Sequence, residues 1–87
     1  MANYKLTFKK SVAKDLRTIP KARVQGLLKK IDSLAENPRA RGCTKLFGHD
    51  LYRARQGLYR ILYTVRDHDR TVNIIKISHR SSVYQQI

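Results

Sequence analysis

Two short segments of this chain carry side chains that can bind or break a phosphodiester. Residues 51–63 read Leu-Tyr-Arg-Ala-Arg-Gln-Gly-Leu-Tyr-Arg-Ile-Leu-Tyr, and residues 79–84 read His-Arg-Ser-Ser-Val-Tyr. Arginine binds phosphate through planar, bidentate hydrogen bonds, and histidine exchanges protons near neutral pH. No carboxylate cluster lies among these residues to hold a metal ion. The pattern therefore predicts an RNA-directed protein and suggests a metal-free ribonuclease. The candidate residues are Arg53, Arg55, Arg60, His79, Arg80 and Tyr84.

Each candidate also has a plain structural explanation. Basic residues on an exposed sheet face are common and often contact only solvent. A histidine often ends a strand at the surface, and Tyr84 could anchor the end of the chain by packing. Arginine occupies all three basic positions of the first segment, although lysine is almost as common in the whole chain. That choice favours phosphate binding, because arginine and lysine are not interchangeable where bidentate contacts matter.

The charge balance points to the same class of partner. The 87 residues include 19 Lys and Arg against 6 Asp and Glu, a formal net charge of +13. Self-repulsion destabilises a protein with such an excess of positive charge, and proteins of this kind usually bind a polyanion, so nucleic acid is the expected partner. A membrane is disfavoured because no stretch approaches 18 apolar residues. A basic surface kept only for solubility is the alternative.

The length and the reactive residues limit the other possibilities. A chain of 87 residues makes one domain, here residues 1–87, with a thin core and no room for a large cofactor. The lone Cys43 has no disulfide partner, so we expect a reducing cytoplasm. The three histidines lack metal-ligand spacing, and no glycine-rich phosphate loop is present. We therefore expect neither a metal nor a cofactor.

The apolar periodicity predicts the elements that must position these residues. Alternation indicates a strand over residues 4–8, and helical spacing indicates helices over residues 11–19 and 20–37. Residues 38–49 are expected to form a loop, followed by strands over residues 51–55, 58–66 and 71–78 with a tight turn at Gln56-Gly57. The fold class is therefore α+β, in the order β-α-α-β-β-β, with an antiparallel sheet and a helical hairpin on one face.

Strand alternation predicts which side chains share a face. In residues 58–66, the set Tyr59, Ile61, Tyr63 and Val65 should lie under the helices. Arg60 and Arg66 then point the other way, and the tight turn brings Arg60 near Arg53 and Arg55 of the preceding strand. We include Arg66, and Lys45 of the loop, as further phosphate-binding candidates. Three arginines without an acidic neighbour repel one another, which favours a ligand anion between them.

The order of motifs resembles the RelE/ParE superfamily of bacterial and archaeal toxins over essentially the whole chain. The motifs that carry the resemblance are a strand, a helical hairpin, Leu46-Phe47-Gly48, then Tyr52-Arg53-x-Arg55-x-Gly57-x-Tyr59-Arg60-x-x-Tyr63, and finally His79-Arg80-x-x-Val83-Tyr84. The resemblance implies the toxin of a type II toxin–antitoxin pair. RelE-type members cut mRNA in the ribosomal A site, without metal, by attack of the ribose 2′-OH on the adjacent phosphate. ParE-type members share the fold, inhibit DNA gyrase and lack the basic catalytic set.

The resemblance also implies roles for individual residues. Arg53 and Arg55 match two basic residues that are usually lysines in the RelE prototype, and Arg60 matches its phosphate-binding arginine. Arg80 and Tyr84 match the arginine and tyrosine of its C-terminal segment, at a shorter spacing. Arginine cannot serve as a base, because its pKa exceeds 12. The proton acceptor is then His79, Tyr84 or a group of ribosomal RNA, and the pKa of histidine favours His79.

The resemblance implies partners as well. An acidic RelB-like antitoxin should cover the basic groove in a toxin–antitoxin hetero-oligomer, and ribosomal RNA should bind the basic surface. Two other functions stay open at this point: a ParE-type gyrase inhibitor, and a plain nucleic-acid-binding or repressor subunit. The arginine set speaks against the first, and the lack of a recognition helix speaks against the second.

Overall fold

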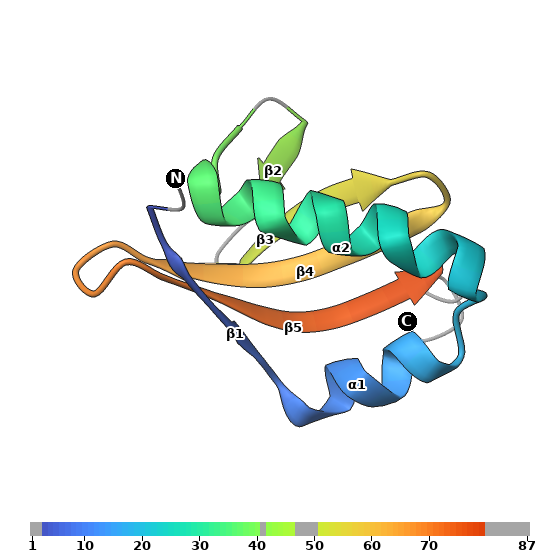
Figure 1. Ribbon diagram of the computed structural model, residues 1–87. Helices are drawn as coiled ribbons and strands as arrows, with labels where there is room; N and C mark the ends of the chain where they lie inside the picture. The colour runs from blue at the N-terminus through green and yellow to red at the C-terminus, as the bar shows by residue number, and fades with distance from the viewer. Residues whose placement is uncertain (1–2, 41, 47–50, 80–87) are drawn as a thin grey trace.

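The computed structural model describes residues 3–40, 42–46 and 51–79, which form a five-stranded sheet and two helices (Figure 1). The class is α+β, as predicted. The elements follow one another as β1 (Lys5–Phe8), α1 (Lys10–Arg17), α2 (Lys21–Glu36), β2 (Cys43–Lys45), β3 (Leu51–Gln56), β4 (Tyr59–Arg66) and β5 (Thr71–His79).

The strands lie in the order β1-β5-β4-β3-β2, so the first and last strands are neighbours. Strands β3 to β5 form the predicted antiparallel meander, and β2 adds to it in antiparallel fashion, whereas β1 runs parallel to β5. The sheet is therefore mixed, and the prediction of a wholly antiparallel sheet is wrong in this respect. The parallel pairing could not be predicted because the two helices separate β1 from the other strands in the sequence. The alternation of apolar and polar residues within β1 does not show whether its neighbouring strand runs parallel or antiparallel to it.

A second difference concerns residues 38–49, which were predicted to form a loop. Part of this segment is β2, which pairs with β3 through Cys43 opposite Ala54 and Lys45 opposite Tyr52. A strand of three residues beside a glycine is too short to show the alternation by which strands are recognised. Its position at the sheet edge matters for the site, because it decides which way Lys45 points.

The two helices cover one face of the sheet, as predicted, and this is where the core lies (Figure 1). Leu27, Ile31 and Leu34 of α2 and Val12 of α1 are almost fully buried, at the helical spacing that the sequence shows. From the sheet, the core receives Tyr52, Ala54, Ile61, Tyr63, Val65, Val72, Ile74 and Ile77. The predicted inward face of β4 is thus confirmed, because Ile61, Tyr63 and Val65 are in the core and the partly buried Tyr59 packs against it.

The turn between β3 and β4 fixes the register on which the site depends. Gln56 pairs with Tyr59, so the turn residues are Gly57 and Leu58, one position later than predicted. Gly57 has φ +61°, whereas Leu58 does not have a positive φ. A two-residue hairpin with glycine in this conformation at its first central position matches a type II′ turn, which suits the twist of the strands.

Helix α1 supports the end of β5 that β1 does not reach. β1 pairs with residues 71–74 of β5 only. Beyond them the Ile77 N–H donates to the Asp15 carboxylate at 3.2 Å, and Lys76 Nζ lies 3.9 Å from the other oxygen of that carboxylate. These contacts hold the C-terminal half of β5 in place. No helix in the described parts of the chain is long and apolar enough to cross a bilayer.

A cluster of polar side chains lies at the other end of the sheet, near the turn between β4 and β5. Arg39 makes a bidentate ion pair with Asp67, with both N–O distances 2.9 Å, and its Nε donates to the Tyr52 hydroxyl. Tyr4 also donates to Asp67. Arg39, followed by Tyr4, holds the pKa of the Asp67 carboxyl below its ordinary value. The fully buried Tyr63 hydroxyl donates to the Pro38 carbonyl at 2.6 Å, and burial raises its pKa well above the ordinary value.

Candidate RNA interface

The sheet face opposite the core carries the arginines that the sequence singled out. Arg53 and Arg55 alternate with the buried Tyr52 and Ala54 of β3, and Arg60 precedes the buried Ile61 of β4. All three therefore point away from the two helices. Arg55 is exposed, and Arg53 and Arg60 are half-buried. We call this surface, made by the outward residues of β3, β4 and β5, the open face.

The register brings the three arginines together. Arg55 lies directly opposite Arg60, and Arg53 lies opposite Leu62, two positions further along β4. Directly opposed residues have Cβ atoms about 5 Å apart, and diagonal neighbours on one face about 7–8 Å apart. One phosphate group can thus contact side chains from both strands.

The strands around the arginines carry basic residues and no acidic ones. None of the five strands contains an aspartate or a glutamate. The aspartates of the β4–β5 hairpin, Asp67 and Asp69, pair with Arg39 and Arg66 at the far end of the sheet. Like charges placed directly opposite each other destabilise a sheet. An anion bound between Arg55 and Arg60, which lie directly opposite each other, would offset their mutual repulsion.

Arg66 shares the open face but lies away from this cluster. It follows Arg60 by six residues along β4, a distance of about 20 Å at the rise of a strand. Its guanidinium pairs with Asp69 at 3.2 Å. The structure does not bring Arg66 together with Arg55 and Arg60, so its predicted share in the same phosphate site is not supported by the geometry.

Lys45 lies on the other face. It pairs with Tyr52, whose ring is part of the core side, so the exposed Lys45 belongs to the helix side of the sheet edge. Lys45 therefore does not lie beside the arginines, and the geometry does not support its predicted share in their phosphate site. The residue of β2 that does share the arginine face is Thr44, opposite Arg53.

His79 also differs from the prediction. It pairs with Tyr59 on the helix side, and the two rings meet edge to face with centroids 5.3 Å apart. His79 therefore does not share a face with Arg60, and the geometry does not support its predicted place in the same site. The register places Ser78, not His79, directly opposite Arg60.

A β-bulge explains this exchange of faces. Tyr63 pairs with Ile74 and Leu62 pairs with Lys76, so Ile75 is an extra residue on β5. A bulge inserts one residue and reverses the alternation beyond it. Without it, His79 would have pointed to the open face. The sequence holds a weak signal for the change, since Ile74-Ile75 are consecutive apolar residues before Lys76 and Ile77 resume the alternation.

Two predicted site residues, Arg80 and Tyr84, lie outside the described residues. Within the described part of the chain, no group of three or more His, Cys, Asp or Glu side chains could hold a metal ion. What the structure brings together is Arg53, Arg55 and Arg60 from two adjacent strands, with Ser78 beside Arg60 on the third. This arrangement can bind a phosphate and stabilise negative charge that develops on it.

Comparison with known proteins identifies the family. The family model described as "ParE toxin of type II toxin-antitoxin system, parDE" matches residues 6–84. A protein of Methanocaldococcus jannaschii named RelE1 is 35% identical over 80 residues, which are 87% of this chain and 89% of that protein.

Solved structures agree with the sequence matches. A chain of the archaeal RelE–RelB complex from Pyrococcus horikoshii superposes with a TM-score of 0.81 at 37% identity, covering 90% of this chain and 96% of that one. The isolated E. coli RelE toxin superposes with a TM-score of 0.77 at 31% identity, covering 95% and 93%. This chain therefore belongs to the RelE/ParE superfamily of type II toxin–antitoxin toxins.

Proposed function

We propose that this toxin is a ribosome-dependent, metal-free endoribonuclease that cuts mRNA in the ribosomal A site. The observation that carries the proposal is the arginine cluster on the open face, with Arg55 directly opposite Arg60 and Arg53 on the same strand face as Arg55. ParE-type gyrase inhibitors, the alternative, lack this basic set. The similarity to RelE proteins, at 31–37% identity, supports the same choice.

The chemistry that we infer is an internal transfer at phosphorus. The ribose 2′-oxygen forms a bond to the adjacent phosphorus, and the bond from phosphorus to the 5′-oxygen breaks. The products are a 2′,3′-cyclic phosphate and a free 5′-hydroxyl. Arg60, with Arg53 and Arg55, would stabilise the additional negative charge of the phosphorane, as preorganised donors do. Arg80 would act at the leaving 5′-oxygen.

The reaction also moves two protons. One leaves the 2′-hydroxyl and one is delivered to the 5′-oxygen. The arginines cannot accept the first proton, because a guanidinium does not lose its charge at neutral pH. Since His79 lies on the helix side of the sheet, its position disfavours it as the acceptor, and Tyr84 or a group of ribosomal RNA is left for this role. A site without a strong base of its own would need the ribosome to align its substrate, which accounts for ribosome dependence.

The proposed partners follow from charge. The +13 surface suits ribosomal RNA, and this contact should weaken steeply with salt. We also propose an acidic RelB-like antitoxin that covers the open face and forms a hetero-oligomer with the toxin. The matching structures include RelE–RelB complexes from several organisms, which supports such a partner. Action on ribosomes would place the protein in the cytoplasm.

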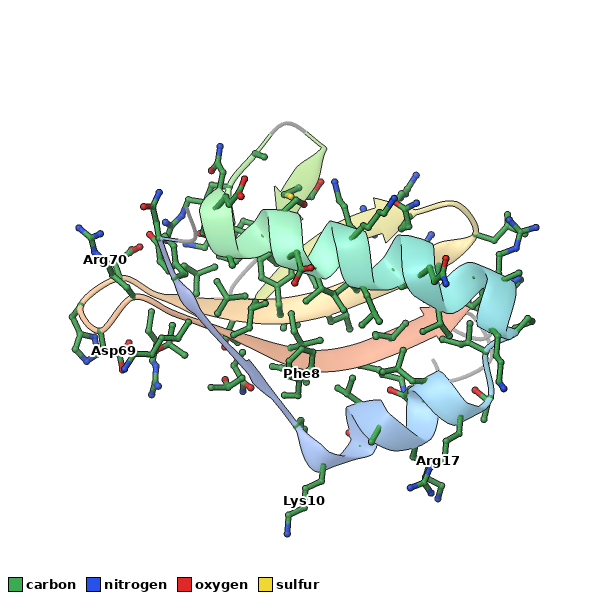
Figure 2. All side chains as sticks on the ribbon, in the orientation of Figure 1. Phe8, Lys10, Arg17, Asp69 and Arg70 are labelled. Atoms are coloured by element: carbon green, nitrogen blue, oxygen red, sulfur yellow. The ribbon has the colours of Figure 1, made fainter. Side chains whose placement is uncertain are left out.

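Primer extension on a defined mRNA tests the proposal. Purified protein is incubated with the mRNA alone and with translating ribosomes, and breaks inside A-site codons are expected only in the second sample. Arg60→Ala should lower the cleavage rate by about 10²–10³-fold, the range for loss of a charge-stabilising donor. Arg17→Ala is the matched control: Arg17 is an exposed arginine of α1 that points away from the sheet (Figure 2).

The outcomes separate the candidate functions. Ribosome-dependent breaks that Arg17→Ala retains and Arg60→Ala loses, with equal melting temperatures, would establish the proposal. No breaks in either sample, together with inhibition of gyrase supercoiling, would establish the ParE-type alternative. Cleavage without ribosomes would mean that the protein is a free ribonuclease.

A further inference from the structure

Apart from tyrosines, two polar side chains are buried in the described part of the chain, and both belong to β5. Thr71 is 6% exposed and Ser78 is 7% exposed. Thr71 pairs with Arg66 and Ser78 pairs with Arg60, so both side chains belong to the open face, at opposite ends of the strand. They form a natural pair for comparison.

The two hydroxyls differ in their hydrogen bonding. Thr71 Oγ1 lies 3.4 Å from the Asp69 carbonyl, to which it donates. Ser78 Oγ has no hydrogen-bond partner, and it is the one buried side-chain oxygen or nitrogen of the described residues in that condition. A buried hydroxyl without a partner lowers stability relative to an apolar side chain of the same shape. Serine at this position therefore does not help the free fold through its hydroxyl.

The neighbours of Ser78 indicate what partner the hydroxyl would take. The register gives a row across three strands, Arg55 on β3, Arg60 on β4 and Ser78 on β5. Adjacent strands lie about 4.8 Å apart, so the row spans about 10 Å. Guanidinium groups only donate hydrogen bonds, and phosphate oxygens only accept them. A hydroxyl does both, so it can accept from a guanidinium and donate to a phosphate at once.

We propose that Ser78 is a phosphate-binding residue of the toxin, whose hydroxyl donates to the RNA phosphate held by Arg60 and Arg55. The inference rests on the proposed function, because the phosphate is that of the RNA substrate. The contact forms only in the bound state. Ser78 Oγ is out of reach of solvent in the free protein, so the side chains that surround it must shift as the phosphate binds. The hydroxyl gains its missing partner at that step.

The proposal predicts an unusual combination of effects. Ser78→Ala should leave the melting temperature unchanged or raise it, because it removes an unpaired buried hydroxyl. The same variant should cleave mRNA on ribosomes about 10- to 100-fold more slowly, as expected for loss of a hydrogen bond to a charged group. Ser78→Thr, which keeps the hydroxyl and suits a strand, should retain most of the activity.

Thr71→Val is the matched control, since it removes a buried hydroxyl of the same strand and face that does have a partner. It should lower the melting temperature and leave the cleavage rate unchanged. If Ser78→Ala cleaves like the wild type, or loses stability as Thr71→Val does, the inference is overturned while the proposed function stands.

A second measurement separates failure of the inference from failure of the proposed function. Binding of a fluorescent single-stranded RNA oligonucleotide is followed by anisotropy for the wild type and for Ser78→Ala. If the wild type does not cut mRNA on ribosomes, the proposed function fails, and weaker oligonucleotide binding by Ser78→Ala still supports the phosphate contact. Equal behaviour of the two proteins, including no binding by either, overturns it.

Discussion

Arg55 and Arg60 face each other directly across the β3–β4 ladder, next to the two-residue turn that fixes their register. In such a hairpin the residues beside the closing pair form a non-hydrogen-bonded pair, in which opposed side chains come closest. Two positive charges at that position repel each other. The pair is unfavourable for the free fold and favourable for an anion.

We therefore expect Arg55→Gln to stabilise the free protein. Removing one charge of an opposed pair should raise the free energy of unfolding by about 0.2–1 kcal/mol at low ionic strength. The gain should shrink as salt is added, because salt screens exposed charges. Thermal unfolding at low and high salt measures both effects, with Arg17→Gln as the control that lacks an opposed cation across a ladder. A lower melting temperature for Arg55→Gln would show that Arg55 has a stabilising contact instead.

The same variant should bind the RNA oligonucleotide more weakly and with a smaller salt dependence. Each phosphate contact that is lost lowers the slope of log K against log salt by about 0.7 for a single strand. A gain in stability with a loss of RNA affinity would show that the cluster is kept for its ligand. Unchanged affinity would remove Arg55 from the binding surface.

The sequence was sufficient for the features that depend on local periodicity. The helical spacing of Leu27, Ile31 and Leu34 predicted the buried side of α2, and all three are at most 1% exposed. The alternation in β4 predicted its inward face. The glycine at position 57 predicted the hairpin, and the turn in the structure lies only one residue later than predicted. These features follow from the period of each element alone.

Features that depend on register between elements could not be predicted. The bulge at Ile75 is an event between two strands, and it moves His79 to the helix side and Ser78 to the open face. The pairing of β1 with β5 joins segments at opposite ends of the chain. The face of Lys45 follows from its pairing with Tyr52, in a strand too short to recognise from sequence. The sequence thus predicted that Arg53, Arg55 and Arg60 lie together, but not which residues of β2 and β5 lie beside them.

The position of His79 leads to a second prediction. Because its ring contacts Tyr59 on the helix side, His79→Gln should slow ribosome-dependent cleavage far less than Arg60→Ala does. The dependence of the cleavage rate on pH should be the same for the wild type and the variant between about pH 5.5 and 8, the range in which an ordinary histidine titrates. Single-turnover cleavage across this range tests it. A loss of a hundredfold or more, with an altered pH profile, would restore His79 as the proton acceptor.

The third prediction concerns the buried hydrogen bond between Tyr63 and Pro38. Tyr63→Phe keeps the ring and its stacking on Tyr52, whose centroid lies 5.6 Å away, but leaves the Pro38 carbonyl without its donor. An unpaired buried acceptor costs about 1–3 kcal/mol. The melting temperature should fall by about 4–8 °C for each kcal/mol in a domain of this size. Tyr4→Phe is the control, because its hydroxyl bond to Asp67 is exposed, and it should have a smaller effect. Equal effects of the two variants would contradict the assignment of Tyr63 as the buried anchor.

The last prediction follows from the lowered pKa of Asp67, which Arg39 causes first and Tyr4 second. A carboxyl whose pKa is lower in the folded state binds fewer protons there than in the unfolded chain. Its contribution to stability is therefore present above its ordinary pKa of 3.8 and is lost as the pH falls through the lower, folded value. Asp67→Asn should have a lower melting temperature than the wild type at neutral pH, and this difference in melting temperature should become smaller below about pH 4.

Thermal unfolding of the wild type and Asp67→Asn from neutral to strongly acidic pH measures this gap. The Arg39→Gln background supplies the control, because residues in one ion pair show coupled effects on stability. In that background Asp67→Asn should lower the melting temperature only slightly at any pH, since the arginine that binds both carboxylate oxygens is gone. A gap that stays constant into strong acid would mean that the Asp67 carboxylate does not stabilise the fold. A full gap in the Arg39→Gln background would assign the effect to Tyr4, the other hydrogen-bond donor to Asp67.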